Sequence, residues 1–218
     1  MLKIELFARQ TSDGWDVFGN EVEGSMIALK IPSDISEKLS KIKVDGKKEL
    51  PEEYHITMFY FDGKLKIDDV CKITKTMNSV LGRFSPPKIS FKEISSFPKG
   101  DDGFPVIVPI ISDELIDVRK SLAKAFDKEK INYSKKWPEF KPHLTLAYSK
   151  KEPTDQKIDK SSWNATELVL YVGDKQEFSK FESGMFVFMP FGKKASSKFE
   201  MIRLASFVFE VEQLNSLI

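Results

Sequence analysis

The only two histidines of this chain stand in the same four-residue phrase, and that repetition limits how the chain can fold. Residues 55–58 read His-Ile-Thr-Met, and residues 143–146 read His-Leu-Thr-Leu. Each phrase continues into an apolar, aromatic stretch, which is typical of a strand that packs on a core. Alternate side chains of a strand point to the same face, so each histidine projects together with its own threonine. If the two strands face one another, all four polar side chains line one cleft.

The segments around the two phrases repeat the same order of expected elements. In the first half we expect a strand at 26–31, a helix capped by Ser33, the strand at 55–61, a helix at 67–80 and a strand at 88–94. In the second half we expect a strand at 106–111, a helix capped by Ser112, the strand at 143–148, a short helix or loop at 151–162, and a strand at 168–172. The histidines lie 88 residues apart, and the strands that precede them start 80 residues apart. This pattern predicts a diverged duplication, with two similar lobes related by approximate twofold symmetry.

Two segments fall outside the repeat. Residues 1–24 include an expected strand at 2–8 and a glycine-containing loop around Trp15. Residues 174–198 are expected to form an elaborated hairpin or flap with a lysine-rich tip. A final strand is expected at 199–209.

Composition and charge exclude several classes of protein. A hydrophobic fraction of 41% over 218 residues is enough for a packed core, and 34 Lys and Arg against 33 Asp and Glu give no overall field that attracts nucleic acid. The single cysteine, Cys71, allows no disulfide framework and suits a reducing compartment. No apolar run approaches the roughly 18 residues of a membrane span, and the charged N-terminus does not fit a signal peptide. We therefore expect a cytoplasmic protein, monomeric, with no affinity for membranes or long DNA.

Two histidines, each with a hydroxyl beside it, suit the cleavage of a phosphodiester. Histidine is the side chain that gives or takes a proton near neutral pH, so one imidazole deprotonates the attacking oxygen and the other protonates the leaving oxygen. Thr57 and Thr145 are uncharged donors for the non-bridging phosphate oxygens. This chemistry needs no metal ion. Which of His55 and His143 is the acid stays open.

Other uses of the histidines fit the sequence less well. Zinc needs further ligands, and no Asp, Glu or Cys cluster stands at ligand spacing. A serine nucleophile lacks its G-x-S-x-G context, and no phosphate loop or dinucleotide fingerprint is present. A lone strand histidine is more often a structural residue, but the duplicated phrase argues against that explanation.

The two phrases resemble the signature of the 2H phosphoesterase superfamily, which is a pair of His-x-Thr/Ser-x motifs with x usually apolar. Pro142, before the second phrase, and Tyr148, after it, are also similar to the family. The resemblance covers about residues 24–172 and the strand expected at 199–209. Residues 1–24 and about 174–198 are then additions to a single bilobal domain that spans residues 1–218.

The resemblance implies an α+β fold with two pseudo-symmetric lobes, each an antiparallel sheet with outer helices, around a central groove. It implies a metal-independent hydrolase, without a cofactor, that acts on 2′,3′-cyclic phosphates, on 2′-5′ or 3′-5′ nucleotide linkages, or on cyclic oligonucleotide signals. By the same resemblance, His55 and His143 are the acid–base pair, and Thr57 and Thr145 grip the phosphate. The expected partner is a nucleotide or a short oligonucleotide.

A nucleotide also needs surfaces that stack on its base and cations that meet its phosphates. Trp137, Phe140 and Lys141 precede the second phrase and are candidates for these roles, as is Arg203 on the expected last strand. Each has an alternative, in which the aromatic ring packs on its own lobe or the cation is solvated. Counting by alternation along the strands places Tyr60 and Tyr148 on the core side.

Two further hypotheses stay open beside the enzyme. One is a non-catalytic protein that keeps the groove and binds a nucleotide or an RNA end. The other is an interaction module whose C-terminal segment contacts another protein. Intact histidine phrases in both halves favour the enzyme.

Overall fold

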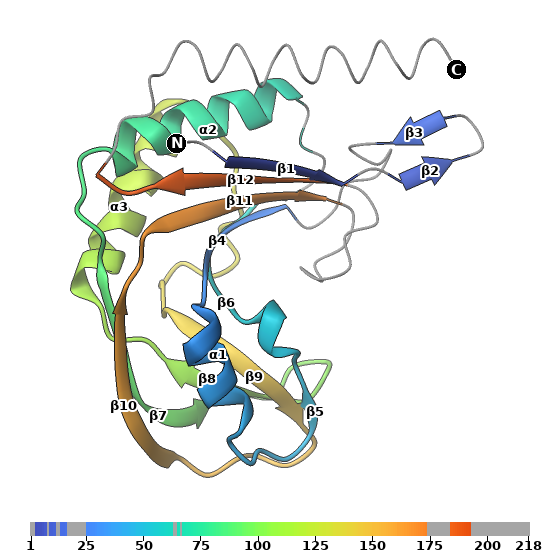
Figure 1. The fold of residues 1–218 in the computed structure, drawn as a ribbon, viewed down its shortest axis with the longest axis vertical. Helices are drawn as coiled ribbons and strands as arrows, with labels where there is room; N and C mark the ends of the chain where they lie inside the picture. The colour runs from blue at the N-terminus through green and yellow to red at the C-terminus, as the bar shows by residue number, and fades with distance from the viewer. Residues whose placement is uncertain are drawn as a thin grey trace.

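The two histidine phrases open strands β6 (His55–Tyr60) and β9 (His143–Ser149), and each strand belongs to a different five-stranded antiparallel sheet. The computed structural model describes residues 3–7, 9–11, 14–16, 25–62, 65, 67–173 and 184–192. Figure 1 shows how the two sheets and the helices are arranged. Within that part of the chain, residues of both sheets and of the helices pack in one large apolar cluster, and a smaller cluster lies on the first sheet. The expected α+β class, with antiparallel sheets and outer helices, is confirmed.

The first sheet has the order β1-β12-β11-β4-β6 and the second has the order β10-β7-β8-β9-β5. The remaining strands of the first sheet are β1 (Lys3–Phe7), β4 (Met26–Lys30), β11 (Glu167–Gly173) and β12 (Gly184–Pro190). Those of the second sheet are β5 (Lys47–Lys48), β7 (Lys88–Ser96), β8 (Phe104–Pro109) and β10 (Gln156–Asn164). A separate hairpin pairs β2 (Arg9–Thr11) with β3 (Gly14–Asp16).

The two repeats exchange their last strands. β7 ends the first repeat but pairs with β8 of the second sheet, and β11 ends the second repeat but pairs with β4 of the first sheet. The trios β11-β4-β6 and β7-β8-β9 are therefore equivalent, with the histidine strand third in each. Because each repeat gives its last strand to the other sheet, neither lobe is a continuous half of the sequence. The exchanged strands also link the two lobes covalently and through hydrogen bonds.

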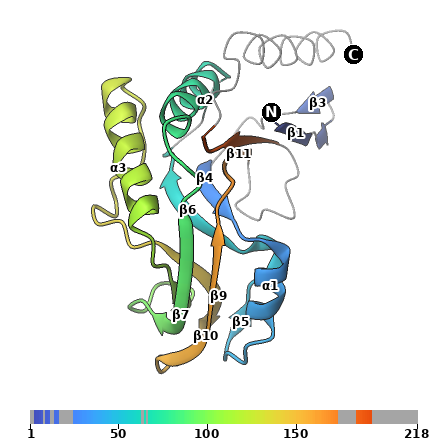
Figure 2. The ribbon, with the colours of Figure 1, turned by 60° about the vertical axis from the view of Figure 1, so that its left-hand side comes forward.

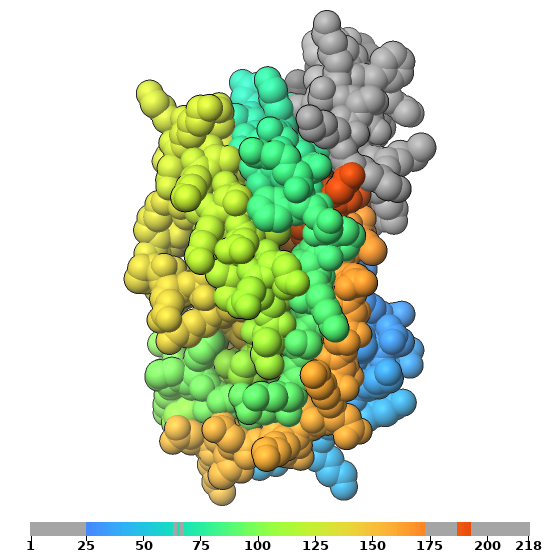
Figure 3. Space-filling model, turned by 90° about the vertical axis from the view of Figure 1, so that its left-hand side faces the viewer, coloured from blue at the N-terminus to red at the C-terminus, as the bar shows by residue number. Residues whose placement is uncertain are grey.

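Helices α2 (Ile67–Leu81) and α3 (Asp113–Lys128) lie side by side on the outside of the molecule (Figure 3). Their apolar positions recur at helical spacing and are buried: Val70, Ile73, Met77 and Leu81 on α2, and Leu115, Val118, Leu122 and Phe126 on α3. The short helix α1 (Ser33–Ser40) lies on the opposite side of the strands (Figure 2). A single 3₁₀ turn, η1 (Pro51–Glu53), leads into β6.

The capping predictions had opposite outcomes. The Ser112 hydroxyl accepts a hydrogen bond from the Leu115 N–H at 3.1 Å, as expected of an N-cap. Ser33 was expected to cap α1, but the helix begins at that residue and Pro32 is the capping position, without a side-chain bond. The Pro32 carbonyl accepts from the N–H groups of Ile35 and Ser36, so the first turn closes one residue earlier than expected.

Three strand predictions need correction. Of the polar segment expected as a helix or loop at 151–162, residues 151–155 are a loop, whereas residues 156–162 belong to β10, because their backbone pairs with β7 and only a few of their side chains need burial. Trp15 lies in β3 rather than in a loop, paired with Gln10. β8 begins at Phe104 and ends at Pro109, two residues earlier than the expected strand.

Residues 174–198 were expected to form an elaborated hairpin or a flap, and residues 184–190 form one strand of a hairpin. β12 pairs with β11 along its length, and β1 pairs with the other side of β12. The expected strand at 199–209 and the lysine-rich tip lie outside the described residues. That residues 1–218 form one domain stays a prediction. No helix in the described part of the chain is both long and apolar enough to cross a membrane.

Candidate active site

The two histidine strands meet where the sheets adjoin. β6 and β9 are in contact, although they belong to different sheets. His55 is the first residue of its strand and stands opposite Lys30 in the register, and His143 is the first residue of its strand and stands opposite Pro109. Both imidazoles are half-buried, and the charge of His143 acts on His55. The chain therefore brings its two histidines within electrostatic range of each other.

Each imidazole makes the same local hydrogen bond. The Nδ1 atom of His55 lies 2.7 Å from the carbonyl oxygen of Glu53, and Nδ1 of His143 lies 2.7 Å from the carbonyl oxygen of Lys141. A carbonyl only accepts, so Nδ1 carries the proton and donates it in both rings. In the neutral form Nε2 is then the basic nitrogen. The two rings share one tautomer and one orientation relative to their strands.

Both histidine strands carry a β-bulge at the third residue after the histidine. Met58 has no register partner between Thr57 and Phe59, and Leu146 has none between Thr145 and Ala147. One extra residue reverses the alternation of the side chains beyond it. Apolar residues before and after each bulge therefore remain in the core.

The bulges overturn the prediction that Tyr60 and Tyr148 lie on the core side. Beyond each bulge the tyrosine returns to the face that carries the histidine and the threonine. Tyr60 then stands opposite Met26, and its hydroxyl oxygen accepts from the Thr57 hydroxyl at 3.4 Å. Tyr148 is close enough to Tyr60 for their charges to interact, and burial, with Glu49 and Tyr60 nearby, raises its pKa. Two phenols therefore join the two imidazoles and two threonines.

A bulge frees the carbonyl of its extra residue from the strand ladder, and the two lobes satisfy that carbonyl differently. The Met58 oxygen accepts from Nε of Arg119, on α3, at 2.6 Å. The Leu146 oxygen accepts from the backbone N–H of Glu49, just after β5, at 2.9 Å. The Arg119 guanidinium also lies 3.5 Å from the centre of the Phe59 ring, and burial lowers its pKa. One bulge is thus held by a side chain and the other by backbone.

Burial lowers the pKa of both histidines. The pKa of His55 falls from 6.5 to about 4, because its surroundings exclude water and because His143 adds a like charge, against the raising effect of the Glu53 carbonyl. The pKa of His143 also falls, through burial, although this ring is less enclosed. Its edge-on neighbour is Phe97, with ring centres 4.7 Å apart. Both rings are therefore neutral near pH 7 before an anion binds.

The substrate residues expected from sequence lie at different distances from this chemistry. Trp137 is 58% exposed, with its ring centre 5.8 Å from that of Tyr60 and 5.0 Å from the Lys136 ammonium, so an exposed indole lies beside the Thr57 end of the site. Phe140 packs against the core, with the Arg119 guanidinium 5.6 Å from its ring centre. The ammonium of Lys141 pairs with Glu139 at 3.1 Å. Arg203 lies outside the described residues.

No group of three His, Cys, Asp or Glu side chains within the described ranges is arranged to hold a metal ion. The site offers instead two imidazoles of one tautomer, with a hydroxyl two residues after each. Such a set is chemically suited to supply a base, an acid and neutral hydrogen-bond donors.

Four residues at or behind the site were not identified from sequence: Tyr60, Tyr148, Arg119 and Phe97. The tyrosines were misplaced because a bulge leaves no mark in an apolar run. Arg119 sits one residue after the buried Val118 on α3, and that position next to an apolar face was the one available signal. Phe97 carries no sequence signal that connects it with His143.

Comparison with known proteins agrees with this fold. The family model described as the 2′-5′ RNA ligase superfamily matches residues 31–177. A search of curated proteins finds no match.

Among solved structures, the chain is similar to the protein TT0787 of Thermus thermophilus, with 15% identity and a TM-score of 0.60 over 79% of this chain and 99% of that one. It is also similar to a structure described as a phosphoesterase, with 18% identity and a TM-score of 0.54 over 78% and 95%. Escherichia coli LigT, solved with ATP, is 16% identical, with a TM-score of 0.53 over 78% and 96%. At such identities the structures show a shared fold, and the family match rests on the chain's own sequence. The chain belongs to the 2′-5′ RNA ligase superfamily, whose members are 2H phosphoesterases.

Proposed function

We propose that the protein is a phosphodiesterase that hydrolyses a 2′,3′-cyclic phosphate end or a 2′-5′ or 3′-5′ linkage of a short nucleotide, with its two histidines as acid and base and without a catalytic metal. The observation that carries the proposal is the matched pair of Nδ1–carbonyl bonds, each 2.7 Å long, which present Nε2 of both rings as the reactive nitrogen. Two lone structural histidines have no reason to share that arrangement.

The steps follow from the environments of the rings. His55, whose pKa is about 4, is neutral over the whole physiological range, so its Nε2 takes the proton from the attacking water. The water oxygen bonds to phosphorus, and the bond from phosphorus to the ribose oxygen breaks. His143, protonated on Nε2, gives its proton to that leaving oxygen.

The anionic substrate itself prepares the acid. A phosphodiester beside the rings raises the pKa of both, because it favours their charged forms. His143 is the less enclosed ring, so it reaches the charged form first. After turnover His55 holds a proton and His143 has lost one, and exchange with water restores the starting state.

The hydroxyls hold the phosphate. Thr57 and Thr145 donate to the non-bridging oxygens, where negative charge builds up in the transition state. Tyr60 orients the Thr57 hydroxyl through the 3.4 Å contact between their oxygens. The exposed indole of Trp137, next to Tyr60, supplies a surface for the base. Escherichia coli LigT has been solved with ATP and with 3′-AMP, which supports a nucleotide ligand here.

A panel of substrates tests the proposal. Purified protein in EDTA is incubated with 2′,3′-cyclic mononucleotides, 2′-5′ and 3′-5′ dinucleotides and cyclic dinucleotides, and products are resolved by mass and by the position of the phosphate. We expect turnover of at least one class, and a loss of 100-fold or more in Thr57→Val and Thr145→Val together. The matched double variant Thr57→Ser and Thr145→Ser, which keeps both hydroxyls, should retain most of the activity.

The alternative is a non-catalytic protein that binds a nucleotide or an RNA end. It is favoured if the wild-type protein binds members of the panel, by calorimetry, but turns over none. Loss of turnover in EDTA that added zinc or magnesium restores would overturn the metal-independent mechanism.

A further inference from the structure

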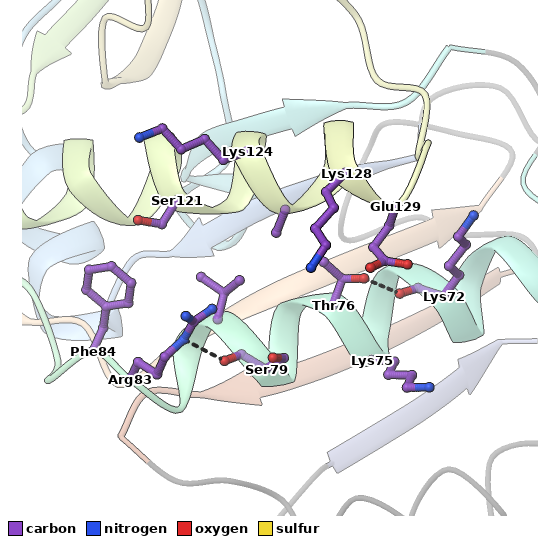
Figure 4. Close-up of a pocket in the computed structure, with 12 residues that line it drawn as sticks. Lys72, Lys75, Thr76, Ser79, Arg83, Phe84, Ser121, Lys124, Lys128 and Glu129 are labelled. Atoms are coloured by element: carbon purple, nitrogen blue, oxygen red, sulfur yellow. Dashed lines mark hydrogen bonds between the residues drawn. The ribbon is translucent and has the colours of Figure 1, made fainter.

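A second polar surface lies on the outer face of the helix pair. A groove of about 860 Å³ runs between α2 and α3 (Figure 4). Three cations line its α2 side, Lys72, Lys75 and Arg83, and two line its α3 side, Lys124 and Lys128. We call these five residues the groove cations. The lining has one carboxylate, that of Glu129.

This groove is separate from the histidine site. The opposite faces of the two helices are buried in the core, where Ile73 and Phe126 pack in the same cluster as Ile56. Ile56 points to the helix side of β6, whereas His55 and Thr57 point to the other side. The helix layer and the first sheet therefore stand between the groove and the imidazoles. Nothing in the proposed chemistry uses the groove.

The groove cations concentrate positive charge that the chain as a whole does not have. The net charge of the protein is +1, whereas the lining carries five cations against one carboxylate. In the described part of the chain, ion pairs use Lys120, Lys135 and Lys141, and none uses a groove cation. Five cations against one carboxylate give the groove a local positive potential, which favours an anionic ligand.

The rest of the lining suits phosphate groups better than a protein partner. Ser79 and Ser121 add hydroxyls between the cations, and the small side chain of Ala125 lets a ligand approach the α3 backbone. Nε of Arg83 donates to the Ser79 carbonyl at 3.0 Å, which holds the guanidinium along the groove. Arg, Lys and Ser are the usual donors to a nucleic-acid backbone, whereas protein hot spots need aromatic and aliphatic anchors at their centre.

The length of the groove and the aromatic ring at one of its ends indicate that the ligand is a nucleic-acid strand rather than a single phosphate. Lys72 and Arg83 stand at opposite ends in Figure 4, and the part of α2 between Lys72 and its last residue, Leu81, is about 14 Å long. A stacked strand carries one phosphate per about 3.4 Å of axis, so several phosphates fit between them. The half-buried ring of Phe84 lies at the Arg83 end, where it can stack on a base.

We propose that the α2–α3 groove binds the sugar-phosphate backbone of single-stranded RNA, away from the histidines that cleave it. This inference deepens the proposed function, since it makes the substrate an RNA strand rather than a free mononucleotide. The groove holds the body of the strand and raises affinity, while the histidine site acts on a terminal or unusual linkage.

Direct binding tests the groove without any catalysis. A fluorescein-labelled 12-nucleotide RNA with a 3′-hydroxyl end is titrated with the full chain, and anisotropy is followed at several salt concentrations. The groove variant Lys72→Gln, Lys124→Gln, Lys128→Gln removes three charges with little change in helix propensity. We expect binding at least tenfold weaker, and a salt slope that is less steep by about 0.7 for each lost contact.

A matched control removes the same number of charges elsewhere. Lys38, Lys92 and Lys157 are exposed, and none lines the groove. The triple variant that changes these three lysines to Gln should bind RNA within twofold of the wild type. Equal binding by wild type and groove variant would overturn the proposal, as would an equal loss in the control. Equally tight, competing binding of a 12-residue poly-glutamate or of phosphatidylserine vesicles would also overturn it, because the groove would then be a general anion surface.

Turnover separates this inference from the proposed function. In the groove variant, we expect unchanged hydrolysis of a 2′,3′-cyclic mononucleotide and a KM raised at least fivefold for a 12-nucleotide RNA with a cyclic phosphate end. A KM that stays the same for both substrates contradicts the groove and leaves the histidine chemistry intact. If the wild type cleaves nothing, the proposed function fails, and the anisotropy measurement still decides the groove.

Discussion

The two histidine strands carry the same residues in the same order, yet the protein supports them in different ways. β9 has β5 on its outer side, and the bulge in β9 is closed by the N–H of Glu49. β6 is the last strand of its sheet, and its bulge is closed by the Arg119 side chain from α3. The loop after α3 adds a bond from the Ser134 N–H to the Tyr60 carbonyl at 2.8 Å. A duplicated motif has thus acquired two unlike surroundings.

The two imidazoles also differ in how far burial lowers their pKa. The deeper ring, His55, is driven to a pKa of about 4, whereas the less enclosed ring of His143 is lowered by burial alone. Acid–base catalysis by two identical groups needs one neutral and one charged at the same pH. In the mechanism that we propose, this asymmetry assigns the base to His55 and the acid to His143.

The largest expected effect comes from exchanging the leaving group. On a dinucleotide, His55→Gln and His143→Gln should each lower kcat/KM by about 10²–10⁴-fold, the range typical of a lost general acid or base. On a nucleoside 3′-(p-nitrophenyl phosphate), whose leaving group needs no proton, His143→Gln should recover to within tenfold of the wild type. His55→Gln should stay inactive, because the water still needs a base. Release of p-nitrophenolate, followed by absorbance, measures this.

Recovery of His55→Gln instead of His143→Gln would reverse the roles that we assign to the two lobes. Recovery of neither would contradict a separate acid. The Thr57→Ser variant serves as the control, because it keeps the hydroxyl and both imidazoles.

The free energy of unfolding should also distinguish the two histidines through its dependence on pH, with a smaller effect than the leaving-group experiment. The pKa of His55 is about 4 in the folded chain, whereas in the unfolded chain the imidazole has its ordinary pKa of 6.5. Between these two pH values the unfolded chain therefore binds more protons than the folded chain. The free energy of unfolding therefore rises with pH from about 4 to about 6.5, and this contribution is complete above that range. For His55 it amounts to at most about 3 kcal/mol. Urea unfolding at pH 4.5, 5.5 and 7 measures the slope.

Relative to the wild type, His55→Gln should flatten that slope, and His143→Gln should flatten it less. Carboxylates titrate in the same range in all three proteins, so the difference between them isolates the histidines. An unchanged slope in His55→Gln would show that the ring is not buried as described.

Much of the site could be read from the sequence because its chemistry is local. The alternation His-x-Thr-x places an imidazole and a hydroxyl on one face of any strand, and the apolar residues between them fix which face is the core. The helix at 67–80, the helix after Ser112 and the strand at 55–61 follow from the same periodicity, and the structure agrees to within a residue or two.

The parts that sequence could not predict depend on contacts between distant segments. Nothing in residues 88–96 or 167–173 shows that these strands change sheets, because strand exchange is decided by which edge is free once both lobes exist. The polar strand at 156–164 forms because β7 offers an edge, not because its own sequence is apolar. Tyr60 and Tyr148 were assigned to the wrong face because a bulge is set by its support, the Arg119 side chain in one lobe and the Glu49 amide in the other.

The bond from Arg119 to the Met58 carbonyl gives the last test of the comparison between the lobes, and its expected effect is the smallest. Arg119→Met keeps a long apolar side chain on the Phe59 ring but removes the donor to the Met58 carbonyl, which then lies buried without that partner. Such a loss costs about 1–3 kcal/mol of unfolding free energy. Because Met58 follows Thr57 directly, we also expect kcat to fall about tenfold with KM changed less than threefold. The neighbouring substitution Lys120→Met is the control, since its ion pair with Asp117 is exposed and contributes little.

In the second lobe, substitution of the residue that closes the bulge should leave the bulge unchanged. Glu49→Gln alters a side chain but leaves the backbone N–H that closes the Leu146 bulge, so the bulge should persist. Titration of the two imidazoles by NMR then distinguishes positioning from mere loss of stability. In Arg119→Met, a relaxed bulge admits water beside His55, so its pKa should move up from about 4 toward 6.5 while that of His143 stays in place. An equal shift at both rings, or at neither, would mean that Arg119 stabilises the core without holding the first histidine strand.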